Sequence, residues 1–157
     1  MFWRWLTVIG LAMTPNLILG QPAAIAAGLR FEMNRWVVVI VVAIASFVEG
    51  LIVMRVAGAG LRLPRLHRWL GRYRTPRALA WCDKWGPWGG LMLGAAVVGT
   101  EPIIIALKTM SVEDRRIVAP LAVSSAVYSG IYYAVVVFGV TLFSRQMNDL
   151  EQIWNLL

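Results

Sequence analysis

Four apolar stretches alternate with short polar segments along the chain, and this pattern predicts helices embedded in a membrane. The stretches run from Trp5 to Leu19, Trp36 to Met54, Gly89 to Met110 and Ile117 to Phe143. The second and fourth are about 19 and 27 residues long, which suits the about 20 residues that a transmembrane helix needs. The first leads into Gln21-Pro22 and the third contains Glu101-Pro102. We therefore expect hairpin breaks at Pro22 and Pro102.

An internal repeat relates the two halves of the chain. Sliding the chain on itself by 80 positions superimposes identical or similar residues: Gln21 and Glu101, Pro22 and Pro102, Arg35 and Arg115, and Gly50 and Gly130. Apolar matches are common in such a composition, but coincident Pro, Arg and Gly pairs are not. The repeat argues against a secretory signal peptide, which the N-terminal pattern of Arg4, an apolar run and small residues would otherwise fit.

Each repeat unit reads as an apolar arm, a proline break, a short second arm, a polar corner and one long helix. The second arm, Pro22 to Phe31, is about 10 residues or about 15 Å long, too short to cross a bilayer. We therefore predict an all-α integral membrane fold of two inverted repeats, each a re-entrant hairpin plus one transmembrane helix. The alternative is a plain bundle of four transmembrane helices, in which Gly89 to Met110 crosses outright.

The predicted organisation is a single membrane domain over 1–157. It comprises repeat 1 (about 5–58), a basic linker (59–84), repeat 2 (about 85–142) and a C-terminal interfacial helix (144–157). The linker carries seven of the fifteen Lys and Arg residues, so the positive-inside rule makes it cytoplasmic in a multi-pass inner-membrane protein. Its arginines at helical spacing predict an amphipathic surface helix, and Thr75-Pro76 predicts the start of a second one. These arginines are Arg62, Arg65, Arg68 and Arg72.

The composition supports a bilayer as the solvent. The chain is 59% hydrophobic and 15% charged, with a mean hydropathy of +0.69, and a soluble domain carries about 25% charged residues. The net charge of +7 favours anionic lipid head groups over nucleic acid as partners. One cysteine and one histidine cannot build a zinc site or a nucleophile–base pair. We expect no enzyme activity and no cofactor.

Two carboxylates lie at membrane depth. Glu49 is within the first long helix and Glu101 is at the second break, with Gln21 at the matching position of the first repeat. A charged carboxylate at the bilayer centre costs about 2.5–3.5 kcal/mol on insertion scales, so it needs a proton, a cation or water. We therefore expect these acids to couple transport to the movement of protons. The structural alternative is that Glu101 caps amides freed by the proline, and that Glu49 pairs with Arg55.

Four basic residues are candidates for binding an anionic substrate: Lys108, Arg35, Arg115 and Arg116. Lys108 follows Glu101 by seven residues on the same helical face, about 10 Å away. The arginines lie at the corners before the long helices and could bind phosphate oxygens. Their alternative role is to anchor the helices at the interface.

The segment from Gly86 to Gly139 resembles the second repeat of the superfamily that holds the DedA membrane proteins and the small multidrug export proteins. The resemblance rests on the Gly-Thr turn, the small-residue arm, the basic corner and the Ser/Gly-rich helix. The turn departs from the family's Pro-x-Pro-Gly-Thr-Gly pattern, because this chain has Val-Val-Gly-Thr-Glu-Pro. The resemblance implies export or flipping of a lipid-like anion, such as a polyprenyl phosphate, driven by the proton gradient.

The sequence therefore predicts a proton-coupled transporter or flippase of a lipid-like or anionic amphiphile, with membrane lipids as partners. The alternative is a non-transporting membrane subunit or scaffold that packs against partner helices. Homo-oligomer formation is left open by the sequence.

Overall fold

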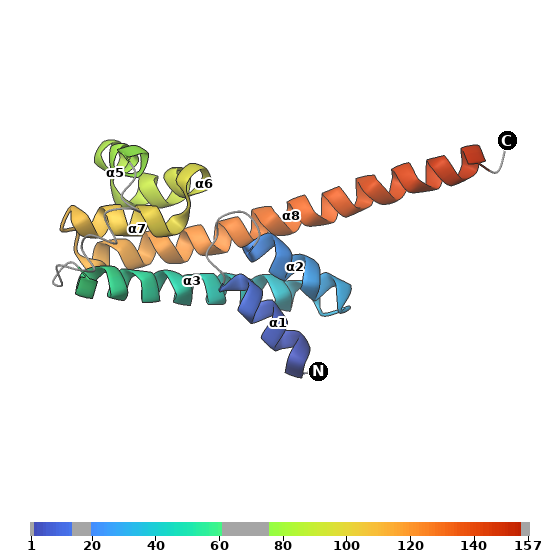
Figure 1. The fold of residues 1–157 in the computed structure, drawn as a ribbon, viewed down its shortest axis with the longest axis horizontal. Helices are drawn as coiled ribbons and strands as arrows, with labels where there is room; N and C mark the ends of the chain where they lie inside the picture. Colours follow the sequence, from blue (N-terminus) through green and yellow to red (C-terminus); the bar gives the residue numbers. More distant parts are fainter. Residues whose placement is uncertain (1, 14–19, 61–75, 155–157) are drawn as a thin grey trace.

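The computed structural model describes residues 2–13, 20–60 and 76–154, with the side chains of 140 and 142–154 excepted. These residues form helices, with no strand among them (Figure 1). The elements are α1 (Phe2–Ala12), α2 (Gly20–Arg30), α3 (Arg35–Gly60), α5 (Pro76–Gly89), the π-helical turn η1 (Gly90–Gly94), α6 (Ala95–Val98), α7 (Thr100–Thr109) and α8 (Asp114–Trp154). The expected all-helical class is confirmed.

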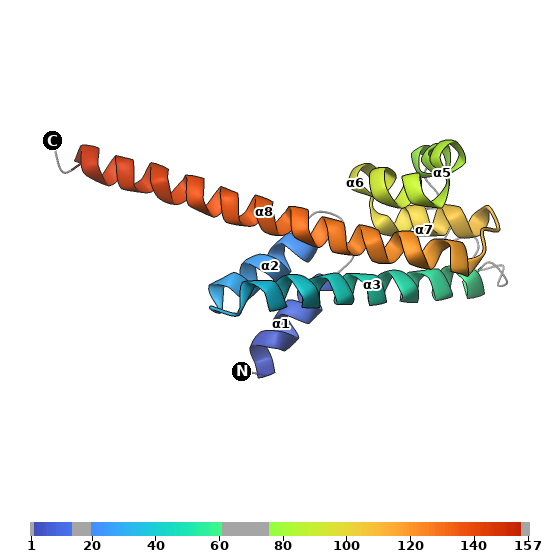
Figure 2. The same cartoon turned by 180° about the vertical axis from the view of Figure 1, so that it is seen from behind.

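Two helices are long and apolar enough to cross a membrane: α3 over Arg35–Gly60 and α8 over Asp114–Gly139. Each has 26 residues, or about 39 Å at 1.5 Å per residue, against a hydrocarbon core about 30 Å thick. They lie side by side and run in opposite directions (Figures 1 and 2). Large apolar side chains stay exposed along both helices, among them Ile40, Ile44, Val127 and Val135. Such a surface suits lipid better than water.

The third apolar stretch is not one helix. α6 ends at Val98, Gly99 adopts φ 97° and ψ 156°, and α7 begins at Thr100. This positive φ favours glycine, which has no Cβ to clash. The chain therefore breaks within the segment that the four-helix alternative requires to be continuous. The break therefore lies at Gly99 and not, as the sequence predicted, at Pro102. Pro22 and Pro102 are each the third residue of a helix, α2 and α7. In the first turn of a helix the missing N–H of proline costs nothing.

The order of elements occurs twice: a pair of short, packed helical arms and then one long helix. α1 packs against α2, and α5 with η1 packs against α7. In Figure 1, α2 and α7 begin near the middle of the molecule and run towards opposite ends. The second arm of each half also packs against the long helix of the other half, α2 on α8 and α7 on α3. The two halves are therefore interlocked at the centre.

The corners before the long helices have the same backbone hydrogen bonds. At the end of α2, the N–H of Glu32 donates to the carbonyl three residues back and that of Met33 to the carbonyl five residues back. Ser111 and Val112 repeat both bonds after α7. Glu32 and Ser111 have φ values of 55° and 60°, as expected at the left-handed residue that ends a helix in a Schellman motif. The corresponding residues are 79 positions apart.

The offset in the long helices is therefore 79 and not 80. α2 has 11 residues and α7 has 10, which accounts for the difference. The buried positions agree with it: Val38, Val42, Ala45, Ser46 and Gly50 on α3 correspond to Ile117, Leu121, Ser124, Ser125 and Ser129 on α8. The sequence alignment of Arg35 with Arg115 is thus wrong by one residue, because both Arg35 and Asp114 are the first residues of their helices.

The C-terminal part differs from the expectation of a separate interfacial helix over 144–157. α8 is continuous from Asp114 to Trp154, and its end extends beyond the other helices (Figures 1 and 2). α5 begins at Pro76, as the Thr75-Pro76 pattern predicts. The arginines of the predicted amphipathic linker helix, at 62, 65, 68 and 72, lie outside the described residues.

Close packing of α2 on α3 gives a first test of the fold. A Cβ atom on Gly28 would lie 2.6 and 2.7 Å from the two Cγ atoms of Val38, a stiff and fully buried side chain. We expect Gly28→Ala to destabilise the protein by about 1–3 kcal/mol, measured as a lower midpoint of thermal unfolding in detergent by tryptophan fluorescence. Gly130→Ala is the control, because nothing lies within 4 Å of its new Cβ. A midpoint for Gly28→Ala equal to that of Gly130→Ala would contradict this packing.

Candidate functional site

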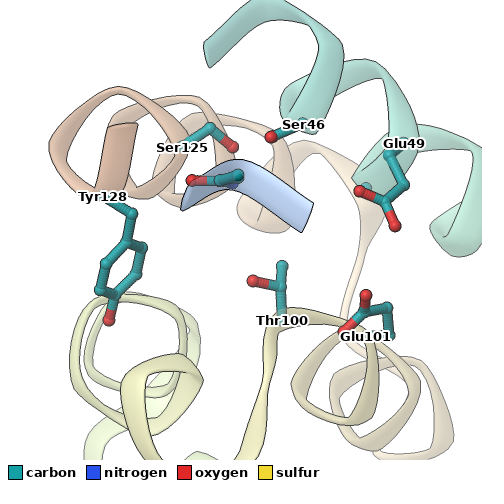
Figure 3. Close-up of a pocket in the computed structure, with 8 residues that line it drawn as sticks. Ser46, Glu49, Thr100, Glu101, Ser125 and Tyr128 are labelled. Atoms are coloured by element: carbon teal, nitrogen blue, oxygen red, sulfur yellow. The ribbon is translucent and has the colours of Figure 1, made fainter. Parts of the chain in front are cut away.

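A small polar pocket lies where the starts of α2 and α7 meet the middle of α3 and α8 (Figure 3). Its lining residues are Gln21, Ser46, Glu49, Gly50, Thr100, Glu101, Ser125 and Tyr128. Ser46 and Glu49 come 11 and 14 residues after the start of α3, and Ser125 and Tyr128 have the same positions in α8. The pocket is therefore about 17–21 Å along each long helix from its start.

Two acids from different halves face each other in this pocket. The carboxyl groups of Glu49 and Glu101 point towards one another (Figure 3) and lie in contact. Two ionised carboxylates that face each other repel, so the pair is most stable with a proton, a cation or a water between them. Arg55, the alternative partner of Glu49, lies instead where its charge acts on Asp114.

Hydroxyl groups form much of the remaining lining. Ser46 and Ser125 are each 5% exposed, and Thr100 comes directly after the break at Gly99. Among the described residues, Ser46 Oγ has no hydrogen-bond partner. The space for the centre of a water molecule is about 10 Å³, which is room for about one water. The pocket in this conformation therefore accommodates a water or a small ion, and not a lipid head group.

The repeat places equivalent residues opposite one another around the pocket. Ser46 corresponds to Ser125 and Glu49 to Tyr128 at the offset of 79, while Gln21 and Glu101 are both the second residue of their arms. The counterpart of the acid pair is therefore a neutral pair. The Tyr128 hydroxyl donates to the carbonyl of Met92 at 2.7 Å, which ties α8 to η1. The pocket has one acidic side and one neutral side.

The predicted anion-binding residues do not line this pocket. Lys108 pairs with Asp114 at 2.5 Å, and Arg115 and Arg116 pair with Glu113 at 2.7 and 3.6 Å. Arg35 lies over the ring of Trp36, 5.9 Å from its centroid. The first three are at the α7–α8 corner and Arg35 is at the α2–α3 corner. The structure brings Glu49, Glu101 and Gln21 together and leaves the basic candidates at the ends of the long helices.

The pairs made by the two corner arginines are exposed. The side chains of Arg115 and Arg116 are 79% and 72% exposed, and a surface pair of this kind contributes about 0–1 kcal/mol. The hydrogen bond from Arg115, followed by the charge of Arg116, lowers the pKa of Glu113 below its usual range. These arginines can exchange Glu113 for another anion at little cost.

The sequence analysis did not identify the pocket hydroxyls or Tyr128 as site residues. The signal that was present is the pair of patterns Ser46-x-x-Glu49 and Ser125-x-x-Tyr128, 79 residues apart. At the offset of 80 these residues are not aligned. Their shared role at the pocket emerges only when the extra residue of α2 is taken into account.

Cys82, the only thiol, is 2% exposed and its Sγ lies 3.9 Å from the carbonyl oxygen of Ile103. Burial raises the pKa of this thiol to about 11. Since the thiolate is the reactive form, Cys82 reacts slowly at neutral pH from either side of a membrane. It is a poor reporter of topology.

Comparison of the chain with protein-family models, with curated proteins and with solved structures finds no match.

The missing hydrogen bond of Ser46 gives a prediction for the stability of a variant. Removing a buried hydroxyl that lacks a partner relieves its desolvation, so we expect Ser46→Ala to keep or raise the unfolding midpoint. Ser124→Ala is the matched control, because the buried Ser124 Oγ donates to Leu121 O at 3.0 Å and its loss costs about 0.5–1.5 kcal/mol. Both are measured by thermal unfolding in choline chloride, whose cation is too large for the pocket. If Ser46→Ala loses as much stability as Ser124→Ala, Ser46 has a hidden partner.

Proposed function

We propose that this chain is a proton-coupled membrane transporter of an anionic amphiphile, built from two inverted repeats of a re-entrant hairpin and a transmembrane helix. The observation that carries the proposal is the contact between Glu49 and Glu101, midway along two long antiparallel helices. An acid pair at that depth is costly to retain. A role in proton transfer explains why the chain has an acid pair at this position.

The lengths of the arms support re-entrant hairpins. α1 and α2 have 11 residues each and α7 has 10, or about 15–17 Å, roughly half of the hydrocarbon thickness. With α3 and α8 across the bilayer, the starts of α2 and α7 lie near its middle. The irregular backbone at Gly99 then lies within protein and beside the pocket, which is where a bilayer tolerates it.

The opposite directions of α3 and α8 support inverted repeats. Two halves related in this way can expose a central site first to one face and then to the other by rocking about it. The acid pair supplies the coupling: it is less costly in a closed pocket when it holds a proton, and it releases the proton when water enters. The pocket has room for about one water, so the substrate enters in a more open conformation.

The distribution of charge supports an anionic amphiphile as substrate. The α7–α8 corner offers Arg115, Arg116 and Lys108 near one end of the long helices, and Arg35 lies near the other. An anionic head group could be taken up at one corner and released at the other, while exposed apolar faces of α3 and α8 accompany its tail. The resemblance of Gly86 to Gly139 to the DedA and small multidrug export superfamily agrees with a lipid-like phosphate.

A scaffold that binds partner helices is the second candidate. Ala122, Ala126 and Gly130 recur every fourth residue on α8 and are exposed in the structure. They do not pack against the chain's own helices, so a partner helix could approach this face of α8 closely. This candidate predicts that substitutions at both glutamates are tolerated.

Glu101→Gln tests the coupling role. The amide keeps the shape and a hydrogen bond to Glu49 but cannot exchange a proton, so we expect proton-driven transport in reconstituted vesicles to fall on the order of 100-fold, as for loss of a proton-transfer group. The unfolding midpoint should change little. Asp83→Asn, which removes an exposed acid of α5 that does not line the pocket, is the control and should transport normally. Normal transport by Glu101→Gln removes the proton-coupling role.

Single cysteines at the two corners test the topology. In a Cys82→Ala background, Met33→Cys and Glu113→Cys should react with an impermeant maleimide from opposite faces of sealed vesicles, because α2 and α7 run to opposite ends. Labelling of both positions from one face contradicts the inverted arrangement.

A further inference from the structure

The pocket offers the oxygen ligands that a small hard cation prefers. Carboxyl oxygens come from Glu49 and Glu101, and hydroxyl oxygens come from Ser46, Thr100 and Ser125. In the described part of the chain, no Lys, Arg or His lines the pocket. Oxygen-rich sites of this kind suit cations that bind carboxylate, hydroxyl and water oxygens rather than sulfur or imidazole. The volume limits the occupant to one ion of about the size of water.

Ser46 gives independent support for a ligand. It is 5% exposed, its Oγ has no hydrogen-bond partner among the described residues, and in Figure 3 this oxygen points into the pocket towards Ser125. A buried hydroxyl without a partner is unfavourable. A bound cation would coordinate this oxygen and remove the penalty.

The charge of the site favours a single positive charge. Two ionised carboxylates contribute −2, whereas the starts of α2 and α7, which face the pocket, contribute about +0.5 each through the helix dipole. About one negative charge remains, and one proton or one monovalent cation neutralises it. A divalent cation would leave an excess of positive charge, and Mg²⁺ would also need space for the waters that it keeps.

We propose that the pocket binds Na⁺ between the carboxylates of Glu49 and Glu101 and the hydroxyl of Ser46, so that a sodium gradient also drives transport. This inference rests on the proposed function, because it names a second coupling ion for the same site. The titratable groups that line the site are Glu49 from α3, Glu101 from α7 and Tyr128 from α8. α2 contributes the neutral Gln21.

Thermal unfolding of the purified full-length chain tests this inference without a transport assay. The midpoint is measured in NaCl, KCl and choline chloride at equal ionic strength and at several pH values. Since a ligand stabilises the state that binds it, we expect NaCl to raise the midpoint above that in choline chloride and above that in KCl.

Three variants locate the effect. Ser46→Ala should keep its midpoint in choline chloride and lose most of the sodium shift, and Glu49→Gln should lose the shift entirely. Ser124→Ala, whose hydroxyl is bonded within its own helix, should keep the full shift. If Glu49→Gln does not fold, Ser46→Ala and Ser124→Ala still decide the matter.

Each contrary result overturns a stated part of the inference. Equal midpoints in NaCl and choline chloride at alkaline pH exclude sodium binding, and an equal shift in KCl excludes the sodium assignment. A full shift in Ser46→Ala places the ion elsewhere. The proposed function fails separately: a sodium shift in a protein that transports nothing leaves the binding site standing, and proton-driven transport without any sodium shift removes only this inference.

Discussion

The contact between Glu49 and Glu101 is the interaction on which this molecule depends. It joins the first half of the chain to the second at the point where two short helices begin between two long ones. Polar groups that are shielded from water need hydrogen-bond partners, a trapped water or an ion. The surrounding helices meet this requirement by enclosing serine, threonine and tyrosine hydroxyls with the acids, and they keep apolar side chains on their outer faces.

The repeat determines the shape of the site, and departures from the repeat determine its chemistry. Ser46 and Ser125 preserve the symmetry, whereas the acid pair is opposed by Gln21 and Tyr128. A fully symmetric pocket would contain two acid pairs and a charge that one ion could not neutralise. Under the proposed function, the single pair carries one coupling ion for each cycle, and the similarity of the two halves serves access from both faces.

The sequence predicted most of the architecture, because hydrophobic length and proline position depend on local physics. The two long helices, the short arms and the start of α5 at Pro76 all follow from such patterns. The predicted position of the second break, Pro102, is three residues from the observed one at Gly99. The repeat offset was correct in the arms but wrong by one in the long helices, because an extra residue in α2 leaves no mark in the residue types themselves.

The site was predicted only in part. Both acids and Gln21 were identified from their depth, but their contact was not, because it depends on α7 packing against the long helix of the other half. The pocket hydroxyls were missed for the same reason. The three arginines were predicted at the corners and lie there, whereas Lys108 was predicted on the helical face of Glu101 and is paired with Asp114 at the α7–α8 corner. Such pairings between neighbouring elements depend on tertiary geometry.

A double-mutant cycle tests the central contact most directly. The free energy of unfolding is measured for the wild type, Glu49→Gln, Glu101→Gln and the double variant. Contact between the two carboxyl groups predicts that the single effects fail to add by about 0.5–3 kcal/mol. Effects that add to within about 0.3–0.5 kcal/mol, as for sites far apart, would show that the two acids do not meet and would contradict the account.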